Sequence, residues 1–85
     1  MIKLRKYVRL WRNMNMKNMK ISYKKLWKLL IDRDMLKKDL AQRAGISTTS
    51  IAKLGKNENV NTDILLKICN ALECELQDIM ELIEE

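Results

Sequence analysis

The chain has 85 residues, enough for one small domain and too few for two independent cores. It contains no Phe and no Pro, and Gly occurs only at positions 45 and 55, which favours short helices around an aliphatic core over a turn-rich β fold. The net charge is +6, but residues 1–20 carry seven bases and no acid, whereas residues 57–85 carry eight acids and one Lys. Clustered bases attract phosphate, so the first half is expected to face a polyanion.

Residues 1–20, MIKLRKYVRLWRNMNMKNMK, differ in kind from the rest of the chain. Their apolar positions fit one face of a helix and also the alternation of a strand, so the periodicity does not decide between the two. We expect a basic N-terminal segment that is poorly ordered or a leader, with translation starting at Met16 or Met19. An arm that grips DNA is the alternative.

Residues 21–85 have the apolar spacing of short helices. Ser22 is a suitable N-cap for a first helix, which the Asp32–Asp34 stretch ends. A second helix is expected from Lys37 to Ala44. Gly45 follows it, where a chain leaving a helix needs the left-handed conformation.

The second half of the chain predicts three more helices. Ser47 is a good N-cap for a third helix over Thr48–Leu54, which Gly55 closes. After a polar loop, Asn61 caps a fourth helix that reaches Leu72. Glu75 precedes a fifth helix, whose inward positions have the spacing i, i+3, i+4, i+7: Leu76, Ile79, Met80 and Ile83. Each helix is too short to be stable alone, so their apolar faces are expected to share one core.

The second and third helices have the pattern of two helices that cross at a steep angle. A small residue, Ala41, suits the crossing, and Gly45 suits the turn. Ile51 and Leu54 bury one face of the third helix, so its opposite face stays free. These positions predict a helix-turn-helix unit.

The stretches "DLAQRAGISTTSIAKL", "GKNENV" and "ILLKICNALECELQDIM" closely resemble the Cro/CI-type (XRE-like) helix-turn-helix family of small phage and bacterial repressors. The resemblance covers residues 21–83. It implies an all-α, compact five-helix fold of the lambda-repressor type, with the helix-turn-helix at helices two and three. We therefore place this domain at residues 21–85.

The resemblance also implies the residues that touch DNA. Lys37 stands where the family often has a Gln that binds phosphate, and Gly55 stands where many members have Glu. The residues that would contact bases have small side chains apart from one Lys, so we expect modest sequence discrimination or a reliance on DNA shape. The implied base readers are Thr48, Thr49 and Lys53, and the implied backbone contacts are Lys37, Ser47, Ser50, Lys56 and Asn57.

The function that follows is a sequence-specific, DNA-binding transcriptional regulator, and more narrowly a repressor of phage, mobile-element or bacterial type. Its partner would be double-stranded DNA. A homodimer through Met80 and Ile83 is left open, and two copies would then read half-sites about 34 Å apart. The alternative is an antitoxin-like or adaptor module that uses the same fold to bind a protein.

Other classes of function find little support in the residues. Without His, Cys69 and Cys74 cannot complete a four-ligand zinc site, and they lack the base that a nucleophilic thiol needs. We expect no enzyme activity, no metal, no cofactor and no small-molecule ligand. The thiols are expected to be reduced in a cytoplasmic protein, and no stretch has the length of a membrane span.

Overall fold

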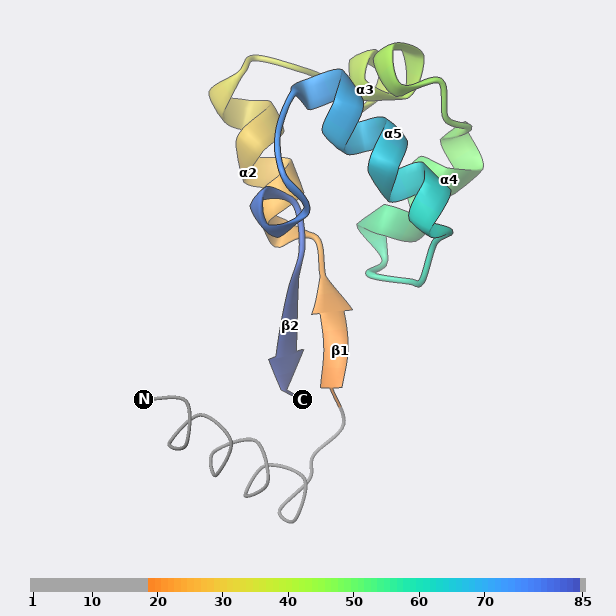
Figure 1. The fold of residues 1–85 in the computed structure, drawn as a ribbon. Coiled ribbons are helices and arrows are strands. Elements are labelled where there is room, and N and C mark those ends of the chain that lie inside the picture. The colour runs from red at the N-terminus through yellow and green to blue at the C-terminus, as the bar shows by residue number, and fades with distance from the viewer. Residues whose placement is uncertain (1–18, 85) are drawn as a thin grey trace.

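The computed structural model describes residues 19–84 (Figure 1). Within them, four α-helices and one short 3₁₀ helix pack together, and a two-stranded antiparallel ribbon projects from the helical body. Both ends of the described chain lie in this ribbon. The elements in chain order are β1 (Met19–Ser22), α2 (Lys24–Asp32), α3 (Lys37–Ala44), α4 (Thr48–Gly55), α5 (Thr62–Leu72), η1 (Leu76–Asp78) and β2 (Glu81–Glu84).

One apolar core joins all of the helices. Each helix contributes leucines or isoleucines from one face, and a fully buried side chain of this kind contributes about 1.5–3 kcal/mol to folding. Because α2, α3 and α4 have only eight or nine residues each, this shared burial stabilises them rather than helix propensity. The buried apolar residues are Tyr23, Leu26, Leu30, Leu40, Ile46, Ile51, Leu54, Leu65, Ile68, Leu72 and Ile79.

The helices end on residues in the left-handed conformation. Gly45 has φ 69° after α3, as the sequence predicts, and Asp34, Asn57 and Glu73 have φ 53°, 56° and 50° after α2, α4 and α5. The main-chain N–H of the residue that follows each left-handed one then bonds back to the helix, as from Glu58 to the carbonyl of Lys53 at 2.9 Å. Asp and Asn are the non-glycine residues that tolerate this conformation best.

The helix boundaries confirm most of the sequence predictions. The predicted second helix, Lys37–Ala44, is α3, and Asn61 takes the N-cap position of α5. Ser22 is not the N-cap of the first helix: it lies in β1, Tyr23 takes the cap position, and the Ser22 hydroxyl accepts the Lys24 N–H at 3.3 Å. Gly55 does not close the predicted third helix either, because α4 includes it.

The prediction of five helices is wrong, because the expected last helix is not formed. Residues 76–78 make one 3₁₀ turn, and Glu81–Glu84 pair with Met19–Ser22 as antiparallel strands. The helical spacing of Leu76, Ile79 and Met80 is still used in part, since Ile79 is fully buried. Pairing between residues 59 to 65 positions apart leaves no trace in local periodicity.

The ribbon is fixed to α2 by Lys25. Its ammonium donates to the Gln77 carbonyl at 3.2 Å and lies 3.6 Å from a carboxylate oxygen of Glu81. Met19 and Lys20 pair with Glu84 and Ile83, so the two last residues of the predicted leader lie within the folded unit. The predictions for residues 1–18 lie outside the described residues.

Candidate nucleic-acid interface

The turn between α3 and α4 sets the direction of α4. Gly45 has φ 69°, and the Ile46 N–H donates to the Ala41 carbonyl at 3.0 Å. A Cβ atom added to Gly45 would meet nothing within 4 Å, so the backbone conformation demands glycine here and steric crowding does not. Ile46 then enters the core at 9% exposure and anchors the chain before α4 begins. The predicted turn is thus present.

Helix α4 has one buried face and one exposed face. Ile51 and Leu54 are buried against the core, whereas Thr48, Thr49 and Lys53 are exposed. Thr49 and Lys53 are four positions apart, so they are neighbours on the same side of the helix. The helix lies at the edge of the domain, away from the ribbon (Figure 1). All three predicted base readers are therefore exposed to solvent, and Thr49 and Lys53 share one side of the helix.

Two serines close the N-terminal end of α4. The Ser50 N–H donates to the Ser47 hydroxyl at 3.1 Å, and the Ser47 hydroxyl donates to the Ser50 hydroxyl at 3.1 Å. Ser47 is therefore the N-cap that the sequence predicts. The first turn of α4 carries no acid, so the positive end of the helix dipole faces solvent without a compensating carboxylate.

Lys37 is the first residue of α3 and reaches across to two other helices. Its ammonium lies 4.6 Å from the ring centroid of Trp27 in α2. The same nitrogen lies 4.0 Å from where a Cβ of Gly55 would stand, at the last residue of α4. Lys56, the next residue, is exposed. Two of the predicted backbone contacts are thus ammonium groups at the C-terminal side of α4.

Asn57 has a structural task. Its side-chain oxygen accepts the main-chain N–H of Tyr23 at 3.0 Å, which joins the end of α4 to the start of α2. Tyr23 itself is fully buried. The carboxamide oxygen of Asn57 is therefore already engaged, and the predicted contact of Asn57 with DNA remains a prediction.

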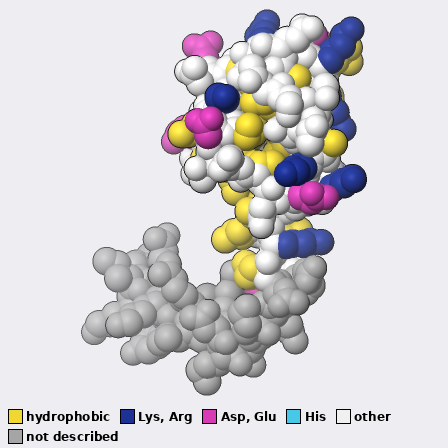
Figure 2. All heavy atoms as spheres, turned by 90° about the vertical axis from the view of Figure 1, so that its right-hand side faces the viewer, with side chains coloured by type: hydrophobic (Ala, Val, Ile, Leu, Met, Phe, Trp, Pro, Cys, Tyr) yellow, Lys and Arg dark blue, Asp and Glu magenta, His cyan; other side chains and the backbone are white. Residues whose placement is uncertain are grey.

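The charge around α4 is mixed but basic close to the helix. The face of the molecule on α4's side carries Lys and Arg side chains spread among uncharged surface, with fewer acids between them (Figure 2).

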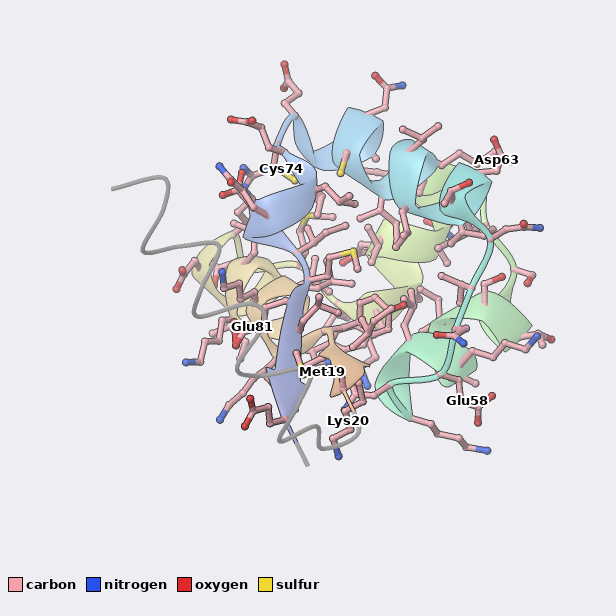
Figure 3. All side chains as sticks on the ribbon, turned by 60° about the horizontal axis from the view of Figure 1, so that its bottom comes forward. Met19, Lys20, Glu58, Asp63, Cys74 and Glu81 are labelled. Atoms are coloured by element: carbon pink, nitrogen blue, oxygen red, sulfur yellow. The ribbon has the colours of Figure 1, made fainter. Side chains whose placement is uncertain are left out.

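The acid nearest the start of α3, Asp39, accepts the Leu36 N–H at 2.9 Å and so caps its own helix. Glu58 lies in the loop after α4 and Asp63 at the start of α5, whereas Cys74 and Glu81 lie on the far side (Figure 3). Asp63 is paired with Lys67 at 3.5 Å.

The two cysteines lie away from this surface, at the end of α5. Both are half-buried free thiols, and burial raises the pKa of Cys74 to about 11. A thiol with such a pKa is protonated at neutral pH and is a poor nucleophile or metal ligand. Residues 19–84 contain no group of three or more side chains suited to holding a metal ion. None of the helices that the structure describes is long and apolar enough to cross a bilayer.

Sequence reasoning missed the contact between Trp27 and Lys37. Trp27 is half-buried in α2 and packs against the core. The two residues are ten positions apart on different helices, so helical periodicity gives no signal that they meet. The structural role of Asn57 was missed for the same reason.

Comparisons with known proteins agree with this geometry. Residues 25–85 match the family model of the Cro/C1-type HTH DNA-binding domain. The chain is also similar to a solved crystal structure of the transcriptional regulator VanUg, with 53% identity and a TM-score of 0.77. That match covers 82% of this chain and 93% of the other. No curated protein sequence matches the chain.

Proposed function

Because the chain belongs to the Cro/C1-type helix-turn-helix DNA-binding family, we propose that it represses transcription by placing α4 in the major groove of a specific operator. The observation that carries the proposal is the exposure of Thr48, Thr49 and Lys53 on a helix whose direction the Gly45 turn fixes. Similarity to a transcriptional regulator supports a role in regulating transcription, and repression is the narrower part of the proposal.

The base contacts follow from the chemistry of these three side chains. Lys53 can donate to the O6 and N7 atoms of guanine, and the threonines can bond a base edge or touch a thymine methyl group. Lys37 and Lys56 would bind phosphates and set the register of the helix without reading sequence. The N-terminal end of α4, whose first turn carries no acid, would add a favourable field for the backbone or for the acceptor atoms of the groove.

The decisive experiment is a selection from random double-stranded DNA with the purified full chain at low salt. We expect one enriched motif, and the absence of any enriched sequence would contradict the proposal. Fluorescence anisotropy then measures the affinity for the selected duplex and for a scrambled duplex. Lys53→Ala should lower the ratio of these two affinities. Lys56→Ala should weaken both by the same factor and lower the salt slope by about 0.9, the value for one lost phosphate contact.

Repression is tested separately from binding. The selected motif is placed either over a promoter or well upstream of it, before a reporter gene. A repressor that acts by blocking polymerase lowers expression from the first arrangement and leaves the second unchanged. Increased expression from the upstream arrangement would show an activator instead.

A further inference from the structure

The Lys37 ammonium is held between two helices. The ring face of Trp27, which packs against the core, lies below it at 4.6 Å from the centroid. Gly55, the last residue of α4, is also near: a Cβ placed on it would lie 4.0 Å from the nitrogen, an ordinary van der Waals contact. The ammonium thus has a defined place although the side chain is exposed.

A held lysine binds phosphate at a lower cost than a free one. A free lysine loses side-chain rotamer entropy when its ammonium is fixed. Here the negative face of the indole and the negative C-terminal end of α4 both attract the cation before any ligand arrives. Part of the ordering has therefore already occurred in the unbound protein.

We propose that Trp27 is a positioning residue for DNA binding: its ring holds the Lys37 ammonium beside the C-terminal end of α4. The phosphate of one DNA strand is the group that the ammonium meets. The inference rests on the proposed function, since it concerns how the same surface grips the backbone. It assigns to Trp27 a role beyond filling the rim of the core.

The contact itself is tested without DNA. In the full chain, the Cε protons of Lys37 over the indole face should resonate upfield of those of Lys38, the exposed neighbour on the same helix. Trp27→Leu should remove this upfield shift, whereas Trp27→Phe should keep part of it. Lys37 resonances that do not move in Trp27→Leu would overturn the inference at its first step.

The function of the contact is tested by a double-mutant cycle on the selected duplex. An exposed cation–π contact of about 0.5–1 kcal/mol corresponds to a two- to fivefold loss of affinity in Trp27→Leu. In a Lys37→Ala background the same substitution should change affinity by less than the error, because no ammonium is left to position. A merely structural role for Trp27 would weaken binding equally in both backgrounds, and this result would overturn the inference.

Two controls keep the cycle interpretable. Circular dichroism and a thermal melt establish that each variant is folded, and Trp27→Phe keeps an aromatic ring in the core should Trp27→Leu not fold. Lys38→Ala should show no coupling to Trp27→Leu. Failure of the unaltered chain to bind any duplex would overturn the proposed function together with this inference, whereas normal binding with an uncoupled cycle overturns this inference alone.

Discussion

Asn57 lends itself to a quantitative test, because its backbone and its side chain make separable contributions to stability. Its φ of 56° is left-handed, and its carboxamide oxygen accepts the N–H of the fully buried Tyr23 at 3.0 Å. Asn57→Ala removes the acceptor and places a Cβ-bearing residue without a polar side chain in the left-handed region. Both changes destabilise the junction between α4 and α2.

The expected magnitude follows from the two contributions. Leaving the Tyr23 N–H without a partner costs about 1–3 kcal/mol. Alanine in the left-handed region costs about 1–2 kcal/mol relative to glycine, and asparagine is better tolerated there than alanine. The sum for Asn57→Ala is about 2–4 kcal/mol, a large part of the 5–15 kcal/mol that is usual for a whole domain. At about 4–8 °C per kcal/mol for a domain of this size, the Tm should fall by about 8–32 °C.

Urea denaturation of three variants separates the two contributions. Asn57→Gly loses the acceptor but keeps the left-handed turn without strain, so it should lose only the hydrogen-bond part. Asn57→Asp keeps an acceptor oxygen and should be the most stable of the three. The difference between Asn57→Ala and Asn57→Gly then measures the backbone strain at this position.

The reasoning would be refuted if Asn57→Ala unfolded within about 0.5 kcal/mol of the unaltered chain, the range of an ordinary surface substitution. A residue whose sole task was a phosphate contact would behave in that way: stability would be unchanged and DNA affinity would fall. The same variants therefore distinguish the structural role seen here from the role that the sequence implies.

Three further predictions concern the turn and the buried titratable groups. Gly45→Ala should lower the free energy of unfolding by about 1–2 kcal/mol in urea titrations, because its φ of 69° strains any residue with a Cβ although the space is open; a loss below 0.3 kcal/mol would contradict this. Tyr23→Phe should leave stability unchanged or raise it by about 1 kcal/mol, because the Tyr23 hydroxyl is buried without a hydrogen-bond partner among residues 19–84; a clear loss of stability would show a missed partner. Burial raises the pKa of Cys74 from 9.0 to about 11, so the folded state binds its proton more tightly than the unfolded state does. The contribution of the Cys74 thiol to the free energy of unfolding is therefore fully present below pH 9 and is lost as the pH rises towards 11. Cys74→Ala should make the decline of Tm between pH 9 and pH 11 less steep.

The helix-turn-helix could be predicted from the sequence because each of its requirements is local. Gly45 is needed for one φ angle, Ser47 for one cap and Ile51 for one buried position, and all of these lie within a short stretch. Periodicity and capping rules describe interactions of this range well. The bounds of α3 followed from them directly.

The remaining features depend on contacts between distant parts of the chain. β2 forms because Glu81–Glu84 pair with Met19–Ser22. The sequence instead predicts that Met19 and Lys20 belong to a leader. The end of α4 depends on Asn57, whose left-handed turn is also the point where Tyr23 docks. In both cases the local sequence is compatible with more than one secondary structure, and the contact with a distant segment determines which one forms.

The division of tasks around α4 has a consequence for how the proposed complex would behave. The outward readers Thr48 and Thr49 are short, and Lys53 is the one long donor among the three, so few bidentate base contacts are available to them. Lys37 and Lys56, by contrast, offer two cations to the backbone, and Trp27 fixes one of them. Affinity would then come mainly from phosphate contacts, and sequence preference mainly from Lys53 and the two threonines. Under this reasoning, loss of the Lys37 contact lowers the affinity for every sequence by about the same factor, whereas loss of Lys53 lowers the preference for the selected sequence.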